Sequence, residues 1–155
     1  LRGGRSHGAW QLEKDAAERL GIEEVDLVLR SREAPDRETL LALPAFFAKL
    51  EYPVLAHCKS GADRAGLFAA LYLMVVEGAN AHRALQELNL LKGHFRYAQT
   101  GILDAFIEAY AEEGERHGKS FLDWVRDDYD PARLTASFRP KRISSLLADR
   151  ILRRE

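Results

Sequence analysis

The sequence predicts an α/β fold with a central parallel sheet flanked by helices and a helical C-terminal half. Two observations support this fold class. In the first half, segments with helical periodicity alternate with short apolar runs, the order that places parallel strands between helices. After Gly78, helical patterns follow one another without another strand-like run. The 155 residues are enough for one domain with a substantial core.

The predicted strands all lie in the first half. Residues 1–4 resemble the end of a strand that starts upstream, so we expect the N-terminal part of the sheet to be partly missing. After a helix expected over residues 13–20, Val25 to Leu29 is an apolar run with β-branched side chains, typical of a parallel strand. Val54 to Ala56, which follows a proline, predicts a second buried strand.

Two further helices are expected in this half. Asp36 can cap a helix that reaches about Leu50, and Pro44 inside it predicts a kink or a break. Residues 67–76 are apolar at helical spacing and predict a buried helix directly after the second strand.

The second half contains only predicted helices. Asn80 can cap one that reaches about Lys92, and residues 98–115 predict another. Ser120 and Asp130 stand where further short helices can start. One face of the 98–115 helix carries Ile102, Leu103, Phe106, Ile107 and Tyr110.

We expect one domain over residues 1–138, followed by a basic amphipathic helix over 139–155. The formal net charge of −1 gives no bulk attraction to nucleic acid or membrane, so membrane contact is expected only through a substrate. No apolar run is long enough to span a bilayer. The single cysteine excludes an internal disulfide and favours a reducing compartment such as the cytoplasm. The five histidines are scattered, so no metal or other cofactor is predicted.

The stretch from His57 to Arg64 carries the candidate chemistry. A strand that delivers Cys58 into a loop before a helix places it beside unpaired N–H groups and the positive end of the helix dipole. A thiol held there loses its proton readily. Gly61 lets the loop turn its N–H groups inward, and Arg64 can hold two oxygens of one phosphate. The pattern therefore predicts a phosphate cradle with a nucleophile at its base.

The run His57-Cys58-Lys59-Ser60-Gly61-Ala62-Asp63-Arg64 resembles the Cys-x5-Arg signature of the cysteine-dependent protein tyrosine and dual-specificity phosphatases. The variant with Asp before the Arg is similar to a bacterial branch of that superfamily. The resemblance implies a dual-specificity-phosphatase-like fold with the loop after one strand of a parallel sheet. It also implies that Cys58 forms a cysteinyl-phosphate, that Arg64 and loop N–H groups stabilise the transferring phosphoryl group, and that water hydrolyses the intermediate.

The resemblance leaves two carboxyl groups as candidates for the general acid. Asp63 lies inside the loop, where similar bacterial phosphatases place their acid, and it is the favoured candidate. Asp36 lies on the loop upstream of the motif, and its alternative role is a plain helix cap. The family often has Ser or Thr after the Arg, whereas this chain has Ala65, which predicts slower turnover of the phospho-enzyme unless another hydroxyl such as Ser60 substitutes.

Weaker assignments complete the predicted site. His57 is expected to orient the loop and to support a low pKa of the thiol. Arg32, with Arg30, can bind a second anionic group, and Gln99 can position the attacking water on a connection that also holds His94 and Arg96. The remaining predicted substrate-binding positions are Lys59, Ser60, Gly61, Ala62 and Ala65.

Three functions remain open at this point. The first is a phosphatase for phosphotyrosine in proteins, with phosphoserine or phosphothreonine as further candidate substrates. The second is a phosphoinositide or inositol-phosphate phosphatase, which the positive charge of Lys59 favours. The third is a phosphate-binding module without activity, which Ala65 favours. The sequence does not indicate an oligomeric state.

Overall fold

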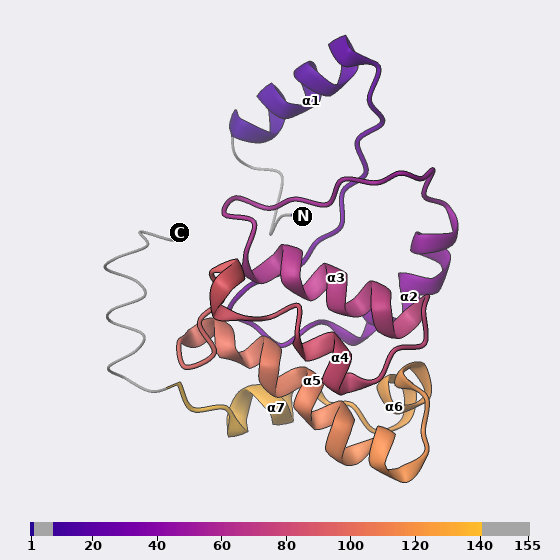
Figure 1. The fold of residues 1–155 in the computed structure, drawn as a ribbon, viewed down its shortest axis with the longest axis vertical. Coiled ribbons are helices and arrows are strands. Elements are labelled where there is room, and N and C mark those ends of the chain that lie inside the picture. Colours follow the sequence, from indigo (N-terminus) through magenta and orange to yellow (C-terminus); the bar gives the residue numbers. More distant parts are fainter. Residues whose placement is uncertain (2–7, 141–155) are drawn as a thin grey trace.

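The computed structural model describes residue 1 and residues 8–140. Within them α1 (Gly8–Leu20) stands apart from the other helices, joined to them by the irregular chain that follows it (Figure 1). The short helix α4 (Ala81–Leu85) lies between α3 (Asp63–Val75) and α5 (Ile102–Glu113). Most of the predicted C-terminal helix, 139–155, lies outside the described residues, and the predicted domain over 1–138 stays a prediction.

No β-strand occurs in the part of the chain that the structure describes, so the predicted central parallel sheet is wrong. Residues 25–29 and 54–56, the two expected strands, have irregular backbone, with one isolated β-bridge at Val28. A strand inside a parallel sheet is buried on both faces and hydrogen-bonded to its neighbours. Leu55 is instead 89% exposed and Val28 is 51% exposed.

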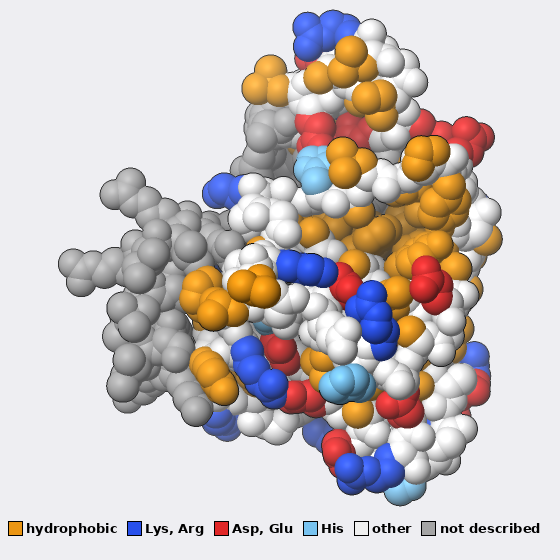
Figure 2. All heavy atoms as spheres, in the orientation of Figure 1, with side chains coloured by type: hydrophobic (Ala, Val, Ile, Leu, Met, Phe, Trp, Pro, Cys, Tyr) orange, Lys and Arg blue, Asp and Glu red, His pale blue; other side chains and the backbone are white. Residues whose placement is uncertain are grey.

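The burial pattern of these segments explains the error. Leu27 and Leu29 pack into the helical core, while Val28 between them faces outward. One side of the segment is thus buried against helices. The β propensity of its valines predicted a strand, but the segment packs on the helices without a neighbouring strand. Figure 2 shows hydrophobic side chains on the surface of the region between α1 and the main body, where Val54 and Leu55 are exposed.

The three helices of the first half are present where helices were predicted, although two of them begin earlier than expected. α2 (Arg37–Ala48) is capped by Asp36, whose Oδ2 accepts a 2.9 Å hydrogen bond from the Thr39 N–H. It continues through Pro44, so the alternative of a break is wrong. α1 begins before residue 13, and α3 begins at Asp63 within the motif, not at residue 67.

The second half is helical, as predicted, but its first helix is shorter. Asn80 caps α4, which ends at Leu85, and a separate 3-10 helix, η1 (Leu90–Lys92), follows and stops at Gly93. The short η2 (Gln99–Gly101) leads directly into α5. The remaining elements are η3 (Glu115–His117), α6 (Phe121–Asp127), which Ser120 caps, and α7 (Pro131–Ser137), which Asp130 caps.

The core is built around α5. Its five predicted core side chains are all buried, and Phe106 and Tyr110 make edge-to-face contacts with Phe121 of α6. Gly66 of α3 lies against the turn that follows α4. A Cβ at Gly66 would lie 2.7 Å from the Glu87 carbonyl oxygen, so only glycine permits this approach near the start of α3.

Candidate active site

Cys58 lies half-buried in the loop that leads into α3. Burial alone would raise the pKa of its thiol, yet the pKa is lowered from its ordinary value because of the groups around the sulfur. The charge of Arg64 acts in this direction, as do three backbone N–H groups that donate to the sulfur. These belong to Ala65, Ser60 and Gly61. The loop therefore favours the thiolate form of Cys58 over that of an ordinary cysteine.

The sulfur of Cys58 replaces the side chain that normally caps the N-terminus of a helix. The N-cap position of α3 is Ala62, which has no side-chain acceptor for the first-turn N–H groups. The N–H of Ala65, three residues after the cap, is the group that a capping Ser or Asp would normally accept, and here it donates to the sulfur. Gly61 has φ +66°, a left-handed conformation that suits glycine and turns the loop toward the sulfur.

Arg64 belongs to the first turn of α3 and is 9% exposed. Its guanidinium is close enough to Cys58 to lower the pKa of the thiol. A planar guanidinium beside a thiolate and inward-facing N–H groups suits the oxygens of a phosphoryl group on that sulfur.

Asp63, the favoured candidate for the general acid, is 5% exposed and hydrogen-bonds to another side chain. Its Oδ1 lies 2.7 Å from Nδ1 of His94, and Nε2 of the same ring lies 2.5 Å from Oδ2 of Asp104. Burial alone would lower the pKa of His94, but its hydrogen bonds to Asp104 and Asp63 raise the pKa to about 9. The ring is therefore a buried imidazolium between two carboxylates.

Asp36 is exposed, and its carboxylate caps α2. The loop before it is fixed from the other side, since the Tyr129 hydroxyl donates a 2.7 Å hydrogen bond to the Pro35 carbonyl oxygen. Arg37 donates in turn to the carbonyl oxygen of Tyr129. The cap role is therefore observed, and a catalytic role for Asp36 stays a prediction.

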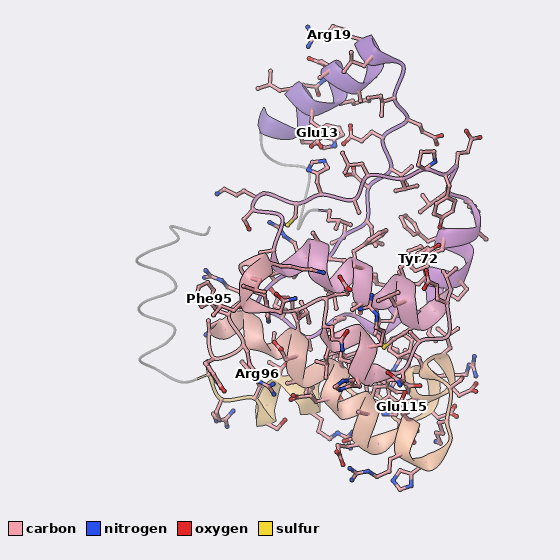
Figure 3. All side chains as sticks on the ribbon, in the orientation of Figure 1. Glu13, Arg19, Tyr72, Phe95, Arg96 and Glu115 are labelled. Atoms are coloured by element: carbon pink, nitrogen blue, oxygen red, sulfur yellow. The ribbon has the colours of Figure 1, made fainter. Side chains whose placement is uncertain are left out.

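His57 contacts α1. Its Nε2 pairs with the Glu13 carboxylate, and its side chain is 56% exposed. In Figure 3, Glu13 lies on α1 above the chain that leads into the motif. The contact ties α1 to the residue before Cys58, whereas the predicted effect of His57 on the thiol pKa stays a prediction.

The structure brings only some of the weaker candidates into contact with Cys58. Ser60 donates its backbone N–H to the sulfur, and Lys59 beside it is exposed at the loop surface. Arg32 is half-buried on the upstream loop, where Arg30 pairs with Glu33 at 3.0 Å. Gln99 is exposed at the start of η2, so its role in positioning water stays a prediction.

Sequence reasoning missed the ion pairs of His94. It placed His94 on the connection between two helices and did not pair it with any carboxylate. The signal lay in Asp104, which stands between the predicted core residues Leu103 and Phe106, because a carboxylate that is buried there requires a partner. Sequence spacing alone could not identify that partner.

No cluster of three metal-binding side chains is found among residues 1 and 8–140. Within the same residues, no helix has the length and hydrophobicity needed to cross a membrane. The predicted cytoplasmic location stays a prediction.

Comparisons with known proteins agree with the geometry of the loop. Over 72 residues, 46% of its length, the chain is 42% identical to the dual specificity protein phosphatase TpbA from two strains of Pseudomonas aeruginosa. The chain covers 27% of the length of these relatives. No solved structure matches it. Residues 11–130 match the model of the tyrosine phosphatase family, which covers α1 to α6 and includes Cys58 and Arg64. The chain therefore belongs to the tyrosine phosphatase family.

Proposed function

We propose that the protein hydrolyses phosphomonoesters through a cysteinyl-phosphate on Cys58 and acts on phosphotyrosine or on phosphoserine and phosphothreonine in proteins. The observation that carries the proposal is the environment of the Cys58 sulfur, which accepts three backbone N–H groups beside Arg64. This arrangement favours the nucleophilic thiolate and supplies donors for the phosphoryl oxygens at the same time.

The reaction has two steps. In the first, the Cys58 thiolate attacks phosphorus, an S–P bond forms, and the bond from phosphorus to the leaving oxygen breaks as that oxygen receives a proton. In the second, water attacks phosphorus, gives a proton to the carboxylate that acted as acid, and displaces the thiolate as inorganic phosphate forms. Arg64 and the loop N–H groups bind the phosphoryl oxygens throughout.

The proton donor is Asp63 or Asp36. The hydrogen bond between Asp63 and His94 at 2.7 Å occupies one oxygen of Asp63, which leaves the other oxygen as the one that could face a substrate. Asp36 is exposed and precedes α2, where a carboxyl group can reach a bound substrate only by loop movement. The effect of the leaving group separates the two, because help from an acid grows with the basicity of the departing oxygen.

Hydrolysis of para-nitrophenyl phosphate tests the proposal directly. Cys58→Ser should reduce the rate to the background level while phosphate binding remains, because a serine hydroxyl is a far weaker nucleophile at neutral pH. Ser137→Ala is a control outside the loop, since it changes an exposed residue at the end of α7 and should keep the activity. Substantial turnover by Cys58→Ser would exclude the cysteinyl-phosphate.

Two other functions have a residue in their favour. Exposed Lys59 beside the cradle favours a phosphoinositide or inositol-phosphate substrate, whose additional phosphates need a cation. Ala65, which supplies an N–H but no hydroxyl, favours a module that binds phosphate without turnover. Rates measured with phosphopeptides, inositol phosphates and phosphoinositide vesicles separate the first two classes, and absence of turnover with all of them would indicate the third.

A further inference from the structure

A buried cluster of three charged side chains, Asp63, His94 and Asp104, starts at the first residue of α3. His94 and Asp104 have no part in the two reaction steps described above. The side chain of His94 is 0% exposed, and those of Asp63 and Asp104 are 7% and 5% exposed. A neutral imidazole has one N–H, whereas both ring nitrogens here face carboxylate oxygens at hydrogen-bond distance. The geometry therefore fits a cation that donates in two opposite directions.

The cluster joins three parts of the chain. Asp63 is the first residue of α3, next to Arg64 and two residues before Ala65, whose N–H donates to the Cys58 sulfur. Asp104 lies in the first turn of α5. His94 comes from the connection between η1 and η2, so its two hydrogen bonds tie the turn that forms the cradle to the central helix of the core.

The connection that carries His94 is folded tightly. A Cβ on Gly101 would lie 1.7 Å from the Arg96 carbonyl oxygen, and the Thr100 hydroxyl donates a 3.2 Å hydrogen bond to the Phe95 carbonyl oxygen. Phe95 and Arg96, which follow His94, lie near the start of α5 in Figure 3. The N–H of His94 also donates a 3.0 Å hydrogen bond to the Asn89 carbonyl oxygen, so His94 is held by its backbone as well as by its ring.

We propose that His94 and Asp104 are positioning residues of the active site. Through Asp63 they hold the first turn of α3 in the orientation that directs Arg64 and the Ala65 N–H at the phosphoryl group. In this role Asp63 anchors the turn and does not donate the proton. The inference rests on the proposed phosphatase function.

Asp104→Asn tests the link at a distance from the sulfur, because Asp104 acts on the loop only through His94. We expect kcat/KM to fall about 10- to 100-fold, mostly in kcat and by the same factor for phosphotyrosine and para-nitrophenyl phosphate, since misplaced groups weaken the transition state for both. The pH midpoint for alkylation of Cys58 by iodoacetate should rise, because the N–H groups no longer converge on the sulfur. If this variant does not fold, His94→Asn, whose amide can still donate to Asp63, should show the same two changes.

Glu115→Gln is the matched control. Glu115 lies beyond the other end of α5, and its Oε1 accepts a 3.0 Å hydrogen bond from the Ala81 N–H, so it also joins two elements through a partly buried carboxylate. It should lower the melting temperature without moving the alkylation midpoint. An Asp104→Asn protein that is less stable but keeps the wild-type midpoint and kcat would overturn the proposal.

Asp63→Asn distinguishes anchoring from proton donation. As an anchor, it should slow both substrates equally, and the double variant with Asp104→Asn should be no slower than Asp63→Asn alone. A loss confined to phosphotyrosine, with Asp104→Asn close to wild type, would make Asp63 the acid and refute the inference. If the wild-type protein hydrolyses no phosphomonoester, the proposed function fails, while the alkylation midpoints still test the cluster.

Discussion

The first turn of α3 stabilises two ionised groups, Cys58 through its backbone and His94 through a side chain, and their pKa values shift in opposite directions. The pKa of Cys58 is lowered, and the pKa of His94 is raised to about 9. Burial opposes the charged form of both groups, so in each case the surrounding donors or acceptors more than offset the loss of water. The thiolate is compensated by N–H groups, and the imidazolium by two carboxylates.

The difference between the two kinds of partner matters for mutation. Backbone N–H groups around Cys58 survive almost any side-chain change, so apart from the charge of Arg64 its environment can be altered only by moving the loop. The hydrogen bonds of His94 depend on Asp63 and Asp104, and one conservative substitution removes either of them. We therefore expect the buried cluster to be the point at which the site can be perturbed without touching the phosphate.

The largest effect is expected at Arg64, whose charge lowers the pKa of Cys58 from the first turn of α3. Arg64→Lys keeps the positive charge but loses the planar pair of donors, so kcat should fall roughly 1,000-fold while the fold is retained. Steady-state kinetics with para-nitrophenyl phosphate measure this effect, and far-UV circular dichroism checks the fold. A loss of less than about tenfold would show that a positive charge at residue 64 is sufficient for catalysis without the planar pair of donors.

A smaller effect, on one class of substrate, is expected at Asp36. With Asp63 committed to His94, Asp36→Asn should lower kcat roughly 100-fold for phosphotyrosine and much less for para-nitrophenyl phosphate, which needs little protonation. Asn caps a helix as well as Asp does, so stability should not change, whereas Asp36→Ala should lose about 1 kcal/mol. Equal rates of Asp36→Asn and wild type with phosphotyrosine would remove Asp36 from the mechanism.

The two ionised groups should also give opposite pH dependences of stability. His94 has a folded pKa above its unfolded value, so its contribution is complete below about pH 6.5 and is lost as the pH rises through about 9. Cys58 has a lowered folded pKa, so its contribution is present above the unfolded thiol pKa and is lost as the pH falls through the folded value. In the wild type the two slopes partly cancel.

Urea unfolding of Cys58→Ser isolates the slope that belongs to His94. Between about pH 6.5 and pH 9.5 its free energy of unfolding should fall by on the order of 3 kcal/mol. Adding His94→Asn should remove most of this slope. A flat profile in the Cys58→Ser protein would mean that His94 is not charged in the folded state.

The smallest effect is expected at Glu13, whose pair with His57 is partly exposed. Glu13→Gln should change the free energy of unfolding by less than about 1 kcal/mol and the rate by less than about twofold, because exposed pairs contribute little. Thermal unfolding and steady-state kinetics check both values. A strong loss of activity would show that α1 orients the loop through His57.

The geometry of the loop around Cys58 could be predicted from sequence because it depends on neighbouring residues. Cys58, Gly61 and Arg64 lie within seven consecutive residues, and their spacing fixes which N–H groups can meet the sulfur. The helix caps Asp36 and Ser120 were predictable for the same reason, since each side chain bonds three residues ahead.

The predicted sheet and the missed cluster both depend on distant partners. A strand such as Val25 to Leu29 needs a neighbouring strand, and its β-branched side chains favour an extended chain without supplying that neighbour. His94 likewise pairs with Asp63, 31 residues away in sequence. The local sequence pattern predicted the backbone conformation that each segment prefers, but not which distant residue contacts it.

The pH dependence of Cys58 alkylation tests the central claim most directly, because this is the single cysteine of the chain and the reaction reports only its thiolate. Iodoacetate should react rapidly at pH 6, with a midpoint well below the value of about 8.5 for a free thiol, and vanadate should block the reaction. A midpoint at or above that value, or alkylation that vanadate does not slow, would contradict a thiolate held in a phosphate cradle.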